Sequence, residues 1–192
     1  MMCLSTDKII YSLFDYTGSW SMPYKDNGYR VIMVDIKHGA DIRTLEVPKE
    51  PVYGVLAAPP CTDFADSGAQ YWNKKDDDGR TLASLELIGA MSRFILATDP
   101  VFWAVENPVG RLNRWFSKPI MYFNPCDYGD AYTKKTGLWG KFNAPIKNPV
   151  EPIKVCKQGS WLMKLGGKSE RTKTLRSITP PGFAQSFYEA NK

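Results

Sequence analysis

The stretch "GVLAAPPCTDFADSG" (residues 54–68) runs from an apolar segment through two prolines to a cysteine. A short apolar run of this kind is typical of a strand that is buried on both faces of a parallel sheet. Pro59 and Pro60 cannot continue such a strand, so we expect it to end there and to present Cys61 in a polar loop. This context favours a reactive thiol over the alternative, a small residue of the core.

Similar apolar runs recur along the chain and alternate with a helical pattern. We expect strands over Lys8–Asp15, Tyr29–Ile36, Val52–Ala58, Val101–Asn107 and Ile120–Asn124. We expect a helix between Gly79 and Asp99, because apolar residues recur there at three- and four-residue steps and Pro100 ends the pattern. Strands that alternate with helices predict an α/β fold with a mostly parallel sheet and helices on both faces.

Chemically useful side chains follow three of these strands. Asp35 closes the second strand, Cys61 follows the third, and Glu106 lies near the end of the fourth. Because ligands bind at the carboxyl ends of parallel strands, we expect the three side chains at one edge of the sheet. Apolar residues precede Glu106, which predicts a partly desolvated carboxyl that stays protonated and donates a hydrogen bond. The alternative is a strand-end acid that pairs with a nearby base.

The segment after the first strand, "FDYTGSW", is a weak nucleotide-binding signal. Tyr16 stands where a first glycine would complete a glycine-rich loop. Asp35 strengthens the signal, since an acid at that point can accept hydrogen bonds from ribose hydroxyls. "GADI", which contains Asp41, offers a further polar contact. "GGKS" (residues 166–169) is not a P-loop, because Leu162 occupies the position of the first glycine.

Composition sets broad limits. The 192 residues, of which 43% are hydrophobic and 23% charged, fit one globular domain. We find no apolar run near the ~20 residues of a membrane span and no secretion signal, so we expect a cytoplasmic protein with no membrane partner. Four scattered cysteines and a single histidine predict no metal site. The basic segment "KLGGKSERTKTLR" (residues 164–176) is either a solvated loop or a mobile loop that contacts phosphates.

Taken together, these segments resemble the cytosine-C5 DNA methyltransferases, particularly the short forms of bacteriophages. "SLFDYTGSW" is similar to the S-adenosylmethionine loop of that family, "VIMVDI" to its ribose-binding strand and "GADI" to its adenine-contacting segment. "APPCTDFADSG" resembles the catalytic loop, "VENPVGRL" the glutamate motif and "RSITPPGFAQSFYEANK" the closing motifs. The resemblance implies a single domain over residues 1–192 with the Rossmann-like fold of S-adenosylmethionine-dependent methyltransferases. For a phage-encoded protein, the compartment would be the host cytoplasm.

The resemblance also implies a mechanism. The Cys61 thiolate adds to C6 of cytosine while Glu106 holds the ring at N3, so that C5 takes a methyl group from S-adenosyl-L-methionine. Loss of the C5 proton then releases Cys61. In duplex DNA the target base must first be flipped out of the stack.

The resemblance assigns further residues to the two ligands. The cofactor is expected to contact Phe14, Asp15, Tyr16, Thr17, Gly18, Ser19, Trp20, Asp35, Ile36, Asp41, Ile42 and Pro59. The DNA is expected to contact Pro60, Thr62, Asp63, Phe64, Asn107, Lys134, Lys135, Lys168 and Arg171. Among these, Phe64 and its loop are expected to cover the flipped base.

The sequence departs from the family in three places. The region of the usual arginine-rich motif reads "YTKKTGLWG", so Lys134 or Lys135 is expected to replace the arginine, and Pro108 stands where many members have valine. Only about thirty residues separate this region from the closing motifs, too few for an independent recognition domain. We therefore expect a reduced or absent target-recognition insert around residues 140–170. Specificity would be low, confined to a short motif or supplied by a partner protein; the oligomeric state is open.

Two other functions are open. The first is a C5-modifying enzyme that acts on a free pyrimidine nucleotide such as dCMP, since thymidylate synthases also present a "PPC" nucleophile. In those enzymes histidine follows the cysteine, whereas Thr62 follows it here. The second is a catalytically weak methyltransferase-like module that binds DNA. The weak glycine loop favours this reading, and the presence of both Cys61 and Glu106 disfavours it.

Overall fold

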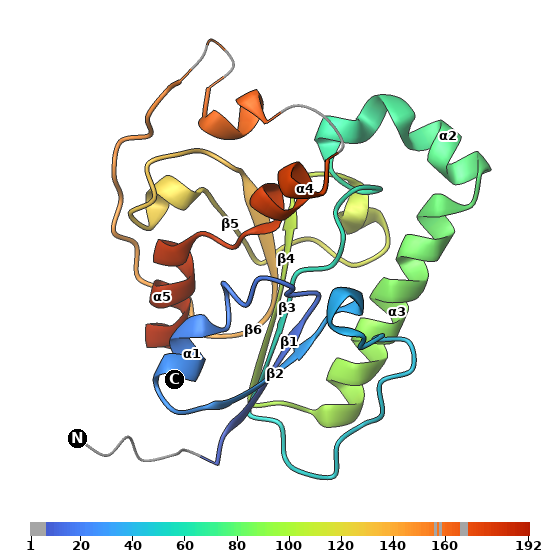
Figure 1. Cartoon of the computed structure of the whole chain (residues 1–192), viewed down its shortest axis with the longest axis vertical. Coiled ribbons are helices and arrows are strands. Elements are labelled where there is room, and N and C mark those ends of the chain that lie inside the picture. Colours follow the sequence, from blue (N-terminus) through green and yellow to red (C-terminus); the bar gives the residue numbers. More distant parts are fainter. Residues whose placement is uncertain (1–6, 156, 158, 166–168) are drawn as a thin grey trace.

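The computed structural model describes residues 7–155, 157, 159–165 and 169–192. Its centre is a six-stranded sheet with the strand order β2-β1-β3-β4-β6-β5 (Figure 1). The strands are β1 (Ile9–Leu13), β2 (Arg30–Val34), β3 (Gly54–Ala57), β4 (Phe102–Pro108), β5 (Met121–Phe123) and β6 (Thr136–Lys141). β1 to β4 run parallel, while β6 runs antiparallel to both β4 and β5. The expected mostly parallel, Rossmann-like sheet is confirmed, and each expected strand overlaps an observed one.

Strand β6 was not expected from the sequence. It contains two glycines, and it follows a polar segment that reads as a loop. Gly140 lies against β4 so closely that a Cβ there would stand 2.0 Å from the carbonyl oxygen of Trp103. The pairing sets Leu138 opposite Glu106 and Gly137 opposite Asn107. β6 therefore holds the glutamate motif in the middle of the sheet.

Helices cover both faces of the sheet. They are α1 (Met22–Asp26), α2 (Trp72–Asp77), α3 (Arg80–Thr98), α4 (Glu170–Ser177) and α5 (Pro181–Ala190). Short 3₁₀ turns are η1 (Ile36–His38), η2 (Asp66–Tyr71), η3 (Arg111–Arg114), η4 (Pro125–Asp127) and η5 (Trp161–Lys164). Along β1, Ile9 and Leu13 belong to the apolar cluster of α3, while Ile10 belongs to the cluster of α1 and α5. In Figure 1, α3 lies along one side of the sheet and α1 and α5 along the other.

Helix α3 matches the helix expected between Gly79 and Asp99. Both flanking residues are left-handed, with φ of 80° at Gly79 and 38° at Asp99, and Pro100 follows. Within the described residues, α3 is the one helix whose length and hydropathy would suffice to cross a membrane. Its residues Ile88, Met91 and Phe94 are buried in the core. The apolar composition of α3 is therefore used in packing on the sheet.

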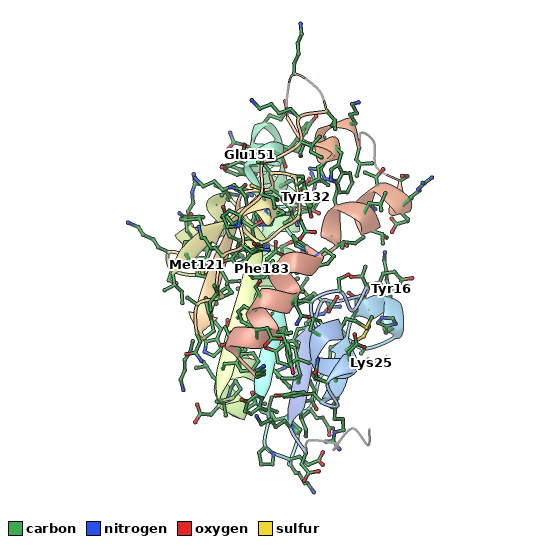
Figure 2. All side chains as sticks on the ribbon, turned by 90° about the vertical axis from the view of Figure 1, so that its left-hand side faces the viewer. Tyr16, Lys25, Met121, Tyr132, Glu151 and Phe183 are labelled. Carbon is green, nitrogen blue, oxygen red and sulfur yellow. The ribbon has the colours of Figure 1, made fainter. Side chains whose placement is uncertain are left out.

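The second core cluster is rich in aromatic side chains from α5. Phe183 is fully buried, and its ring stacks on Phe123 of β5 with 3.9 Å between centroids and an interplanar angle of 10°. Tyr128 packs edge-on against the same ring at 5.3 Å. Figure 2 labels Phe183 at the upper end of α5. The C-terminal helix is thus an integral part of the core.

Phe183→Ala is expected to lower the free energy of unfolding by about 3–5 kcal/mol, because it removes a buried ring that the stacked partners cannot replace. Urea denaturation followed by far-UV circular dichroism would measure the loss. Tyr122→Ala is the control, since Tyr122 is an exposed aromatic residue of β5, the strand whose Phe123 stacks on Phe183. A loss below about 1 kcal/mol for Phe183→Ala would mean that α5 is not part of the cooperative core.

Candidate functional site

A cavity of about 620 Å³ opens at the carboxyl ends of the parallel strands. This volume falls within the range of sites that hold cofactors and other small molecules. Ten of the residues predicted to act in binding or catalysis line it: Phe14, Tyr16, Asp35, Ile36, Asp41, Ile42, Pro60, Cys61, Thr62 and Asp63. Residues from four separate sequence segments therefore line one cavity, as the positions of their strands predict.

Other predicted residues do not line this cavity. They are Asp15, Thr17, Gly18, Ser19, Trp20, Pro59, Phe64, Glu106, Asn107, Lys134, Lys135 and Arg171. Lys168 lies outside the described residues.

The loop after β1 is ordered from within by Asp15. The Asp15 carboxylate accepts hydrogen bonds from Ser12 Oγ at 2.8 Å and from Ser21 Oγ at 3.1 Å. Gly18 has a φ of 69°, a left-handed backbone conformation that residues other than glycine rarely adopt. This network leaves Phe14 and Tyr16 at the cavity wall.

Trp20 is a correction to the predicted cofactor site. Its side chain is only 1% exposed and packs against Phe183 and Phe187 of α5. A large apolar ring gains more by joining this aromatic core than by facing a solvated cavity. Trp20 is therefore a core residue and presents no side-chain surface to a ligand.

Two carboxylates stand at the cavity wall beyond β2. Asp35 accepts a hydrogen bond from the backbone N–H of Lys37 at 2.8 Å, which caps η1. Asp41 accepts from Arg43 through both carboxylate oxygens. The Arg43 guanidinium lowers the pKa of Asp41, so this carboxylate stays ionised. Both acids offer hydrogen-bond acceptors to a ligand in the cavity.

One hydrogen bond connects the glutamate motif to the loop that carries Cys61. Asn107 Nδ2 donates to the carbonyl oxygen of Pro59 at 2.9 Å, which ties the end of β4 to the loop that carries the thiol. Glu106 is 5% exposed. Burial raises the pKa of the Cys61 thiol, the charge of Lys134 lowers it, and Glu106 raises it further. The resting thiol is therefore protonated near neutral pH.

The two lysines of "YTKKTGLWG" occupy different environments. Lys134 Nζ lies 3.5 Å from Glu106 Oε1, with the lysine side chain 15% exposed. Lys135 is exposed and lies over the ring of Tyr122, 5.4 Å from its centroid. Lys134 is thus the lysine that pairs with Glu106. Glu106 therefore has the basic partner expected for a strand-end acid that pairs with a nearby base.

A buried arginine that the sequence reading missed clamps the cysteine loop. Arg111 is 2% exposed, and its Nε donates to the carbonyl oxygen of Asp63 at 2.9 Å. Nη1 donates to Asp76 Oδ2 and Nη2 to Thr81 Oγ1, each at 2.8 Å. The backbone N–H of Arg111 donates to the carbonyl oxygen of Phe64 at 2.8 Å. Arg111 therefore joins the loop after Cys61 to α2 and α3.

The same clamp requires a glycine before the arginine. A Cβ on Gly110 would stand 1.9 Å from the carbonyl oxygen of Phe64. The close backbone approach also includes a bridge between Gly110 and Ala65. Gly110 and Arg111 lie in the "VENPVGRL" segment, but nothing in the sequence alone marks this arginine as buried.

Phe64 is a correction to the predicted DNA contacts, whereas Asp63 lines the cavity but is held by partners within the protein. Phe64 is fully buried in the α3 cluster, so its ring has no surface with which to cover a base. Asp63 forms a buried ion pair with Lys75 at 3.2 Å and accepts from Ser84 Oγ at 2.7 Å. Because the clamp fixes the loop, these side chains turn inward and hold it in place.

Helix α4 forms the outer wall of the cavity and corrects the expected loop. The residues that line the cavity from α4 are Lys173, Thr174, Arg176 and Ser177. Ser169 caps the helix by accepting from Thr172 N at 3.2 Å. Lys37 reaches Glu170 at 3.2 Å and links α4 to η1. Figure 1 shows α4 beyond the upper ends of the strands.

Arg171 remains a predicted DNA contact. It is exposed and does not line the cavity, whereas Lys173 and Arg176 do. Lys173 and Arg176 are three residues apart, so they share a face of the helix. The sequence marks residues 164–176 as basic. Without a predicted helix, it does not show which of these residues face the cavity.

A search against family models and a search of curated protein sequences both find no match. Among solved structures, the chain is similar to one described as a DNA modification methyltransferase encoded within an E. coli prophage, at 16% identity and a TM-score of 0.49. That match covers 85% of this chain and 56% of the other.

Two further similar structures are methyltransferases by description. The first is EhMeth of Entamoeba histolytica, at 12% identity and a TM-score of 0.48, covering 85% of this chain and 61% of the other. The second is a triple mutant of Spodoptera frugiperda DNMT2, at 18% identity and a TM-score of 0.42, covering 84% and 60%. The chain thus spans less than two thirds of the length of each of these structures. At this identity, the activity of the chain has to be argued from its own residues.

Proposed function

We propose that this protein transfers a methyl group from S-adenosyl-L-methionine to C5 of cytosine in DNA, through a covalent bond between Cys61 and C6 of the base. The observation that carries the proposal is the hydrogen bond from Asn107 to the carbonyl oxygen of Pro59, which joins the glutamate motif to the loop of Cys61. Cys61 lines the cavity, and Glu106, which directly precedes Asn107 on β4, is buried. Covalent catalysis needs a nucleophile, and an acid can neutralise the charge that develops on the substrate.

The cavity suits the proposed cofactor by its size and by the chemistry of its wall. Its volume of about 620 Å³ accommodates a nucleoside with an attached amino acid. Apolar side chains such as Phe14, Ile36 and Ile42 offer surfaces for a purine ring, and Asp35 and Asp41 offer acceptors for hydroxyl and amino groups. S-adenosyl-L-methionine would supply the methyl group from this cavity.

The residues of the chain would carry the remaining steps. Cys61 would give its proton to water and bond through its sulfur to C6, while Glu106 gives a proton to N3 and so neutralises the charge that develops on the ring. After C5 has gained the methyl group, water would take the C5 proton and the Glu106 carboxylate would take back the N3 proton, so that the C5–C6 double bond forms again and the Cys61 thiolate leaves. Lys134 Nζ lies 3.5 Å from Glu106 Oε1, so the base would displace Lys134 from this carboxyl when it enters the site.

Transfer of labelled methyl groups from S-adenosyl-L-methionine tests the proposal. We expect labelling of cytosine in single- or double-stranded oligonucleotides and none of free dCMP. Labelling of dCMP alone would replace the proposal with the nucleotide enzyme. Absence of both labelling and cofactor binding would leave a fold without this activity.

Lys134→Ala is expected to lower the rate of methyl transfer by about tenfold. Burial raises the pKa of the Cys61 thiol and the charge of Lys134 opposes that effect, so its removal leaves less of the nucleophilic thiolate. Lys135→Ala is the matched control, since the neighbouring lysine faces Tyr122 instead. Initial rates at saturating cofactor would measure both. Equal losses in the two variants would contradict the assignment of Lys134.

We also propose that target recognition in this chain is reduced. Between β6 and α4, the described residues form extended segments and the short turn η5. Ile146 and Ile153 in this region are 85% and 63% exposed. A segment of this size supports contact with a short motif or with a specificity partner rather than an independent recognition domain.

A further inference from the structure

Arg176 reaches the cavity of Cys61 from the opposite end of the chain. It lies in the last turn of α4 and lines the same cavity as the thiol. Its Nη1 donates to the carbonyl oxygen of Leu165 at 3.4 Å, a long hydrogen bond. No carboxylate among the described residues forms an ion pair with it.

The other cations of the cavity wall are each paired. Arg43 lies 2.6 Å from Asp41, and Arg80 lies 2.5 Å from Asp78. Lys37 and Lys173 both reach Glu170, at 3.2 and 2.6 Å. Among the described residues of this wall, Arg176 is therefore the cation that has no carboxylate to offset its charge.

Charged groups on two other elements act on Cys61, and a further charged group lies on its own loop. Lys134 precedes β6 and Glu106 lies on β4; these two groups stand 3.5 Å apart, so their opposite effects on the thiol partly cancel. Asp63, on the loop of the cysteine itself, is held by Lys75. The charge of Arg176 also lowers the pKa of Cys61, against the burial that raises it.

We propose that Arg176 is a positioning residue for the nucleophile: from α4 it supplies the cavity of Cys61 with a positive charge that no carboxylate among the described residues offsets, and it acts on the thiol when the thiol gives its proton to water. The role in catalysis rests on the proposed function, whereas the effect of the charge on the thiol can be measured without DNA or cofactor. An arginine suits this role because it keeps its charge at all relevant pH values.

The test is the pH profile of Cys61 alkylation by iodoacetamide, followed by mass spectrometry of the peptide that contains Cys61. In Arg176→Ala we expect the midpoint to move to higher pH and the rate near neutral pH to fall about threefold, as for loss of one charge acting partly through water. Arg176→Lys should retain most of the wild-type rate, because it keeps the charge. Arg171→Ala is the matched control, since Arg171 is an exposed cation of the same helix outside the cavity wall.

Identical profiles for wild type, Arg176→Ala and Arg171→Ala would overturn the inference. A shift in Arg176→Ala alone would support it, even if the wild-type protein methylates no DNA, in which case only the proposed function fails. Methylation by the wild type with no shift in Arg176→Ala would leave the proposed function and remove this role of Arg176.

Discussion

Cys61→Ala is expected to abolish methyl transfer to DNA, with a rate at least about 10³-fold below that of the wild type. An alanine methyl group cannot bond to C6 of the base, and without that bond C5 does not become nucleophilic. Initial rates of label transfer from S-adenosyl-L-methionine to a cytosine-containing oligonucleotide would measure the loss. Since Cys61 is only partly buried, its replacement should leave the unfolding temperature nearly unchanged.

Cys126→Ala is the matched control for this prediction. Cys126 is the other free cysteine among the described residues, it is also partly buried, and it lies on η4 outside the cavity wall. We expect its replacement to leave the rate within about twofold of the wild type. A Cys61→Ala enzyme that keeps a tenth of the wild-type rate would contradict the covalent mechanism.

Arg111→Ala is expected to lower the free energy of unfolding by about 3 kcal/mol, because the substitution leaves the partners of a buried guanidinium without their donors. The same change frees the loop after Cys61 from α2 and α3, so we expect methyl transfer to fall more steeply than stability alone explains. Urea denaturation and the initial rate, measured below the unfolding transition, separate the two effects. Arg111→Lys should recover little, since a single ammonium cannot donate in the three directions that the guanidinium serves.

Arg114→Ala is the control for the clamp. Arg114 belongs to the same short turn as Arg111 but is exposed, and its described contact is with the ring of Trp72 at 5.5 Å. We expect a change within about 0.5 kcal/mol. Comparable losses in Arg111→Ala and Arg114→Ala would show that the effect is not specific to the buried network.

The sheet could be predicted from sequence because its central strands are buried on both faces. Continuous apolar runs such as "GVLAA" (residues 54–58) identify them, and the polar residues that follow the strands mark the edge where the cavity forms. Asp35 and Cys61 line this cavity as expected, whereas Glu106 does not line it. Strand β6 could not be predicted in this way, because it contains glycines and follows a polar segment. Its position depends on close backbone contact with β4.

The inward turn of individual side chains could not be predicted in the same way. Phe64 and Asp63 lie in a polar loop, where exposure is the usual expectation. Phe64 is buried in the apolar cluster of α3, Asp63 is held by Lys75 and Ser84, and Arg111 fixes the backbone between them. The clamp depends on contacts between residues far apart in sequence. Likewise, the choice between Lys134 and Lys135 depends on how β6 pairs with β4, and that pairing was not visible in the sequence.

Trapping on DNA that contains 5-fluorocytosine tests the covalent role of Cys61 most directly. Fluorine at C5 cannot leave as a proton would, so the enzyme stays bonded to C6 after methyl transfer. We predict a denaturant-resistant protein–DNA adduct that requires S-adenosyl-L-methionine, forms with the Cys126→Ala variant and is absent from Cys61→Ala. An adduct of equal yield with Cys61→Ala, or none with the wild type on DNA that it methylates, would contradict the mechanism.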